Sequence, residues 1–236
     1  MVNYIPIVTT ILAVIFLRHL ALHAKAKPHA KYLFWWAIGI ATYGLGTLTE
    51  SIHAIFGWQE ANFKIWYIVG ALLGGAPLAQ GTVYLLTNKK FGDITSLILV
   101  AVVAIASVFV LLSPVVLPMD FDGRLSGKVF GWQWVRAFSP FLNTYAFLFL
   151  FGGAIYSAVK YARMGRSNKR FLGNVYIAIG ALLPGIGGSF TRFGYVEVLY
   201  VTELAGLLFM YWGYQVMRKD SEVSVHAEQL AVQESV

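Results

Sequence analysis

Two glutamates lie inside long apolar stretches of the sequence, where an ionisable side chain is costly to keep. Glu50 lies eight residues before Trp58, and Glu203 lies eight residues after Tyr195. In a helix each spacing corresponds to about 12 Å, so the two carboxyl groups are expected at a similar depth. Burying a charged group in a bilayer costs on the order of a few kcal/mol, so such residues are rarely kept without a partner or a role. We therefore predict that Glu50 and Glu203 anchor a ligand or carry a proton.

Other polar and aromatic residues are expected beside the two glutamates. His53 shares a helix face with Glu50 and can hydrogen-bond to it or hold a proton near neutral pH. Arg192 is the available cation. The remaining candidates for a pocket in this half of the protein are Tyr43, Trp66, Tyr67, Asn143 and Tyr200. The structural alternative is a buried ion-pair network of Glu50, His53 and Arg192.

No metal site or enzyme motif is predicted. Glu50 and His53 have the Glu-x-x-His spacing of di-iron bundles, but such a site needs two of these motifs and two further acids. His19 and His23 are expected to reach the aqueous edge of the membrane rather than to bind a metal. The sequence has no cysteine, no Gly-x-Ser-x-Gly, no phosphate loop and no His-Glu-x-x-His.

The composition places these residues in a membrane domain. Of the 236 residues, 58% are hydrophobic and only 12% are charged, whereas a soluble domain has about 25% charged residues. The apolar stretches lack the two-residue alternation of a membrane barrel, so we predict an all-α bundle of seven transmembrane helices, followed by a disordered tail over 220–236. The predicted helices are 4–22, 32–56, 64–86, 94–116, 138–161, 171–193 and 195–217.

The distribution of Lys and Arg predicts the orientation of the bundle. Alternate loops carry thirteen basic residues on one side of the membrane and five on the other. The positive-inside rule then places the N-terminus outside and the C-terminus in the cytoplasm. This pattern is typical of a multi-pass protein in a cell (inner or plasma) membrane, and it accounts for the net charge of +7 without nucleic acid as a partner.

Two features indicate where the bundle bends and how it is built. Pro77 and Pro184 fall near the middles of two predicted helices, where each should produce a kink that can act as a hinge. Two glycine-containing triplets, 37–39 and 44–46, recur 141 residues later at 178–180 and 185–187. The recurrence predicts a parallel 3+1+3 repeat of helices. The alternative is that these glycines only let helices approach closely.

Seven helices with an outer N-terminus, a proline in the sixth and an acid in the seventh resemble the topology of the microbial rhodopsins. That family binds retinal through a lysine in helix seven, whereas this sequence has Leu207 four residues after Glu203 and no lysine inside any helix core. A covalent pigment is therefore contradicted, while noncovalent binding of a lipid, retinoid or carotenoid is compatible with the sequence. The repeat is similar to the plan of small sugar transporters, but their Pro-Gln pair is missing.

The function expected from these observations is binding or sensing. We expect a heptahelical protein that accepts a small amphipathic or apolar ligand in an outer-half cavity and passes a conformational signal through its kinked helices. One alternative is a small-solute or proton-coupled transporter in which Glu203 takes up and releases a proton. A further alternative is a structural subunit of a membrane complex. The expected partners are the lipid bilayer and a small molecule, and a homo-oligomer or a membrane partner is compatible with the sequence.

Overall fold

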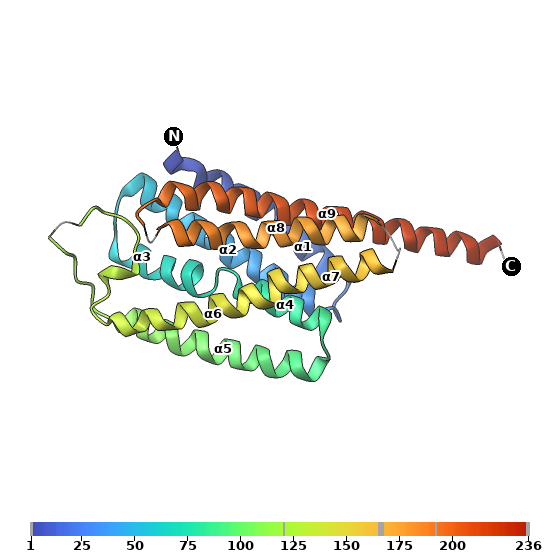
Figure 1. Ribbon diagram of the computed structural model, residues 1–236, viewed down its shortest axis with the longest axis horizontal. Coiled ribbons are helices and arrows are strands. Elements are labelled where there is room, and N and C mark those ends of the chain that lie inside the picture. The colour runs from blue at the N-terminus through green and yellow to red at the C-terminus, as the bar shows by residue number, and fades with distance from the viewer. Residues whose placement is uncertain (1, 120, 165–167, 192, 235–236) are drawn as a thin grey trace.

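The computed structural model describes residues 2–119, 121–164, 168–191 and 193–234, with side chains described up to residue 220. Within these ranges the chain forms seven helical runs joined by loops, and no named β-strand. Figure 1 shows the runs lying side by side along the long axis of the molecule, with α9 projecting beyond the bundle at the end opposite the N-terminus. The helices are η1 Val2–Tyr4, α1 Ile5–Ala26, α2 Lys31–Phe56, α3 Glu60–Trp66, η2 Tyr67–Leu72, α4 Ala76–Leu86, α5 Lys89–Leu112, η3 Gly127–Val129, η4 Gln133–Ala137, α6 Phe138–Ala146, η5 Phe147–Phe151, α7 Gly152–Arg163, α8 Asn168–Thr191 and α9 Val196–Glu234.

Six of these runs are long and apolar enough to cross a membrane, which indicates a multi-pass membrane protein. They are Val2–Ala26, Glu60–Leu86, Lys89–Leu112, Gln133–Arg163, Asn168–Thr191 and Val196–Asp220. The count is one fewer than the sequence predicts, because α2, a helix of 26 residues, is not among these six spans.

The third run is interrupted rather than kinked. A π-helical segment, η2, follows α3, and a short break at 73–75 separates it from α4. Pro77 lies in the first turn of α4, where its missing N–H costs no helical hydrogen bond. The Ser139 hydroxyl of α6 donates to the carbonyl oxygen of Ala71 over 3.0 Å, which satisfies one backbone group beside the break. By contrast, Pro184 lies inside α8, which continues through it.

Two helix ends differ from the predicted boundaries for local reasons. The helix predicted from residue 94 begins at Lys89, because the Asn88 side chain accepts a hydrogen bond from the backbone N–H of Phe91 over 2.9 Å and so caps the helix. The last helix continues to Glu234 through the segment predicted to be disordered. That segment contains no Gly or Pro, and Arg170 of α8 pairs with Asp220 of α9 over 3.1 Å.

Two of the recurring glycines, Gly39 and Gly180, lie where helices approach closely. A Cβ on Gly39 of α2 would lie 2.9 Å from the backbone nitrogen of Leu78 in α4. A Cβ on Gly180 of α8 would lie 2.6 Å from the carbonyl oxygen of Gly206 in α9. Each glycine thus brings its helix against the next run along the chain, as small residues do in membrane proteins.

Candidate functional site

The two predicted glutamates meet inside the bundle. Glu50 comes from α2 and is 3% exposed, and Glu203 comes from the facing turn of α9. Their carboxyl groups lie within hydrogen-bonding contact of each other. In both groups the Oε2 atom is buried and has no donor among the described residues. Neither carboxyl group takes part in the ion pairs that the described residues form.

Three aromatic residues surround this carboxyl pair, which we define as Glu50 and Glu203. The Trp66 indole donates from Nε1 to Oε1 of Glu50 over 3.0 Å. The Tyr43 hydroxyl donates to the backbone carbonyl of Glu203 over 2.9 Å and thereby ties α2 to α9. Tyr200 is buried one turn before Glu203, close enough to both carboxyl groups to interact electrostatically. The structure therefore brings Tyr43, Trp66 and Tyr200 to the carboxyl pair.

The position of Trp66 depends on the unusual helix that follows it. Trp66 is the last residue of α3, and the π-helical turns of η2 start at Tyr67. π-helical turns in otherwise α-helical segments occur frequently at functional sites because they re-aim the side chains around them. No sequence signal identified η2, because the number of residues per turn in a π-helix differs from that in an α-helix by less than one residue.

His53 lies one turn beyond Glu50 on α2 but makes no contact through Nδ1. This nitrogen is buried and has no hydrogen-bond partner among the described residues. The expected bond between His53 and Glu50 is therefore not formed through Nδ1. His53 therefore lies between Glu50 and the end of α2, which is followed by the loop that ends at Gln59.

Asn143 and Tyr67 do not join the carboxyl pair. Asn143 is exposed on α6, where its amide donates to the Ser139 hydroxyl over 3.1 Å. Tyr67 packs instead against Phe130 of the long loop, with ring centroids 4.8 Å apart. Arg192 lies outside the described residues. The sequence placed these residues by depth alone, and depth does not reveal which way a side chain faces.

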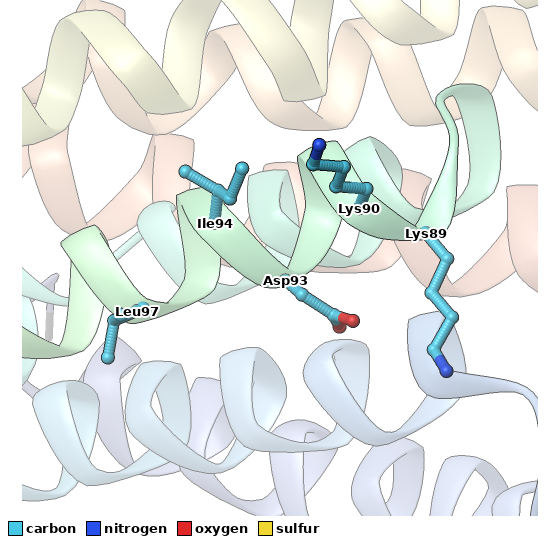
Figure 2. Close-up of a pocket in the computed structure, with 5 residues that line it drawn as sticks. All are labelled: Lys89, Lys90, Asp93, Ile94 and Leu97. Atoms are coloured by element: carbon cyan, nitrogen blue, oxygen red, sulfur yellow. The ribbon is translucent and has the colours of Figure 1, made fainter.

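Two cavities lie away from the carboxyl pair. The larger, about 560 Å³, is an open groove on the first turns of α5 lined by Lys89, Lys90, Asp93, Ile94 and Leu97. Figure 2 shows Lys89 and Lys90 extending to different sides of this groove. The smaller, about 30 Å³, lies in the bundle and is lined by Phe16, Leu20, Trp36, Ile40, Leu78, Leu150, Ile177, Met210 and Tyr214. Neither cavity is the expected ligand pocket, because no residue of the carboxyl pair lines it.

Comparison with protein-family models, with curated proteins and with solved structures found no match to this chain. The chemistry of the site therefore has to be argued from its own geometry. No group of three or more His, Asp or Glu side chains gathers in the described part of the chain to hold a metal ion. What the site offers is two adjacent, buried carboxyl groups that can accept hydrogen bonds and bind protons.

Proposed function

We propose that this chain is a seven-transmembrane-helix, proton-coupled transporter of a small solute, in which Glu50 and Glu203 share a proton. The observation that carries the proposal is the contact between two buried carboxyl groups, each with an Oε2 atom that lacks a donor. The basic loops give an N-terminus outside and a C-terminus in the cytoplasm, with α2 as the seventh span.

A shared proton follows from the chemistry of the pair. Two ionised carboxylates are acceptors only, so neither can satisfy the free oxygen of the other. Side by side in a site that excludes water, they also repel each other, and aspartic proteases relieve the same conflict by holding one proton between two acids. One proton on the pair supplies a donor for the free oxygens and removes most of the repulsion.

The helix architecture supports transport over sensing. Transporters commonly place their ion sites beside interrupted helices and at the interface between helix repeats. Here α3 supplies Trp66 immediately before the interrupted segment 67–75, and Pro184 lies inside α8, which packs against the helix that carries Glu203. Gly39 and Gly180, which correspond in the proposed 3+1+3 repeat, each contact the following run.

The binding or sensor alternative needs a preformed ligand pocket. Pockets for small molecules usually measure about 300 Å³ or more. The cavity lined by Phe16, Leu20 and Ile40 measures about 30 Å³, which by itself is too small for an amphipathic ligand. A transporter needs no large resting cavity, because its site opens to one side at a time.

The shared proton is tested directly by infrared spectroscopy of the purified protein. A protonated carboxyl group has a C=O band that is separate from carboxylate absorbance and shifts on exchange into D₂O. We expect this band at neutral pH in the wild type and its loss in Glu203→Gln, because the new amide can donate to Glu50. Glu197→Gln, an exposed acid on the same helix, is the matched control. A band of equal strength in Glu203→Gln would contradict the shared proton.

Coupling is tested in sealed proteoliposomes that contain a trapped pH dye. Sugars, amino acids, organic cations and carboxylic acids are added in turn under an inward proton gradient. We expect one class to be taken up together with protons by the wild type and by Glu197→Gln, and not by Glu203→Gln. Uptake that is unaffected by Glu203→Gln would refute the assigned role of this residue.

A further inference from the structure

A second hydrogen-bonded cluster joins α1 to α9 nearer the opposite end of the bundle. Tyr211 lies 3.1 Å from His19, measured from its hydroxyl to Nδ1, and accepts a hydrogen bond from Nε2 of Gln215 over 2.8 Å. One turn further on, Nδ1 of His23 lies 3.0 Å from the Tyr214 hydroxyl. The two histidines thus face tyrosines of α9 instead of extending freely to the aqueous edge, as the sequence analysis expected.

The hydrogen bonds of Tyr211 fit one tautomer of His19. The Tyr211 hydroxyl accepts from Gln215 and has one hydrogen, which it can donate to His19 when Nδ1 is unprotonated. In that tautomer Nδ1 of His19 is the acceptor, and the proton of the neutral imidazole lies on Nε2. This leaves Nε2 as the atom of His19 that can exchange a proton with water.

An apolar layer separates this cluster from the carboxyl pair. Tyr211 lies eight residues after Glu203 on α9, which corresponds to about 12 Å along the helix. Leu207 and Met210 are buried between them on α9, and the Phe16 ring of α1 lies 5.1 Å from the Tyr211 ring. Leu207, Met210 and Phe16 are apolar, so these side chains provide no hydrogen-bonded path for a proton between the carboxyl pair and Tyr211.

We infer that His19 and Tyr211 form the inner proton-exchange site of the transporter, an inference that rests on the proposed function. A proton released from the carboxyl pair reaches the Tyr211 oxygen when the apolar layer opens. The original hydroxyl proton of Tyr211 then passes to Nδ1 of His19, which becomes an imidazolium ion. The imidazolium releases its Nε2 proton to water on the inner side. Tyr211 keeps the incoming proton, and His19 returns to the neutral form as the other tautomer, from which a flip of the imidazole ring restores an unprotonated nitrogen towards Tyr211.

The groups that face His19 fit this role. On α1, Arg18 is exposed and His23 lies one turn nearer the inner end; on α9, the neighbours are Tyr211, Tyr214 and Gln215. The Tyr214 hydroxyl lies 3.5 Å from the backbone carbonyl of His19. The described hydrogen bonds and ion pairs place no carboxylate on His19 that would trap the imidazolium ion.

The first test measures water access from the inner side and does not depend on transport. Because the chain has no cysteine, single-cysteine variants can be labelled with a membrane-impermeant maleimide in inside-out vesicles. We expect Gln215→Cys to react about tenfold faster or more than Trp212→Cys, which lies on the same turn but is 56% exposed on the outer surface of the bundle. Equal or slower labelling of Gln215→Cys would overturn the inner exchange site.

The second test measures proton flux in the proteoliposomes described above. His19→Gln and Tyr211→Phe should slow proton uptake about tenfold or more, whereas His29→Gln, an exposed histidine near the same end of the bundle, should leave it unchanged. Tyr211→Phe keeps the ring packing against Phe16, so a comparable loss in both variants supports the relay over a packing defect. If Glu203→Gln abolishes uptake but His19→Gln does not slow it, the relay is refuted and the proposed function stands. If wild-type vesicles show no proton-coupled uptake, the proposed function falls, and the relay falls with it.

Discussion

The buried side chain of Gln80 offers a quantitative test of the packing around the interrupted helix. Gln80 is fully buried on α4. Its amide donates to the carbonyl oxygen of Gly92 over 2.9 Å and to the Thr95 hydroxyl over 3.1 Å, and its Oε1 accepts from the Tyr145 hydroxyl over 2.7 Å. One side chain thus links α4 to α5 and α6, which agrees with the expectation that a polar residue inside a membrane bundle cross-links helices.

The cost of Gln80→Leu follows from which partners lose a bond. The Thr95 hydroxyl shares its single hydrogen between the carbonyl oxygens of Gly92, at 3.1 Å, and Phe91, at 3.0 Å, so the Gly92 carbonyl keeps a donor. Only the Tyr145 hydroxyl is left without its partner, and Thr95 lies close enough to interact with it. A buried polar group without its partner costs about 1–3 kcal/mol. Because Thr95 can partly replace Gln80, we expect a loss of about 1–2 kcal/mol in the free energy of unfolding.

A double-mutant cycle measures the bond itself. Tyr145→Phe leaves Oε1 of Gln80 without a donor and should cost a similar amount, while the double variant removes both groups and leaves neither unsatisfied. Unfolding in mixed micelles of mild detergent and SDS gives the three free energies. The double variant should lose less stability than the sum of the single variants, by about 1 kcal/mol. Additive losses would show that the two side chains do not interact, and the described link between α4 and α6 would be refuted.

Three further predictions concern packing, the hinge and orientation. Gly187→Ala should destabilise the protein by about 1–3 kcal/mol in the same unfolding assay, because the new Cβ would lie 2.8 Å from a backbone Cα of α9. In the control, Gly188→Ala, the new Cβ meets nothing within 4 Å, so this variant should be neutral or stabilising. Equal effects of the two substitutions would contradict the close contact. Pro184→Ala restores a helical hydrogen bond in α8 and should raise thermal stability while slowing solute uptake, and unchanged uptake would exclude a hinge at this position. Gln59→Cys should react with an impermeant maleimide in intact cells and Lys27→Cys only after lysis; the reverse pattern would invert the proposed orientation.

The helices themselves could be predicted because the bilayer constrains them strongly. Each apolar stretch must satisfy its backbone internally, so length and hydropathy are nearly sufficient to locate it. The break at 73–75 could not be located in this way. Pro77 signalled a disturbance, but a proline inside α8 leaves that helix continuous, while Pro77 starts α4 after an interruption. Whether the helix breaks depends on neighbours that are distant in the sequence. One example is Ser139, whose hydroxyl donates to the Ala71 carbonyl oxygen 68 residues earlier in the chain.

The candidate site could be predicted only in part, for a related reason. A depth argument brought Glu50 and Glu203 to one level, because helix rise is regular. The depth argument gave no information about the direction in which a side chain points. It therefore grouped Asn143 with the two glutamates, although the Asn143 side chain is exposed. The partners of His19 and His23 lie more than 190 residues further along the chain. Nothing in the local sequence around two histidines at the end of a helix shows that tyrosines of the last helix will meet them.

The contacts of α9 determine which parts of the bundle can move in the proposed transport cycle. A Cβ on Gly206 would lie 2.7 Å from the Gly180 carbonyl oxygen, and one on Gly213 would lie 3.2 Å from the backbone nitrogen of Ile177, so α9 packs against α8 backbone to backbone over about two turns. Towards α1 and α2, by contrast, α9 is joined by separable hydrogen bonds such as the one from Tyr43 to Glu203. Sliding the tightly packed pair would break the close backbone contacts that its glycines allow, whereas side-chain hydrogen bonds can be exchanged for water. In the proposed cycle we therefore expect the seam between α9 and the first two helices to open. The carboxyl pair, the apolar layer and the His19 cluster all lie along that seam, so opening it at one end exposes one proton site while the apolar layer keeps the other closed.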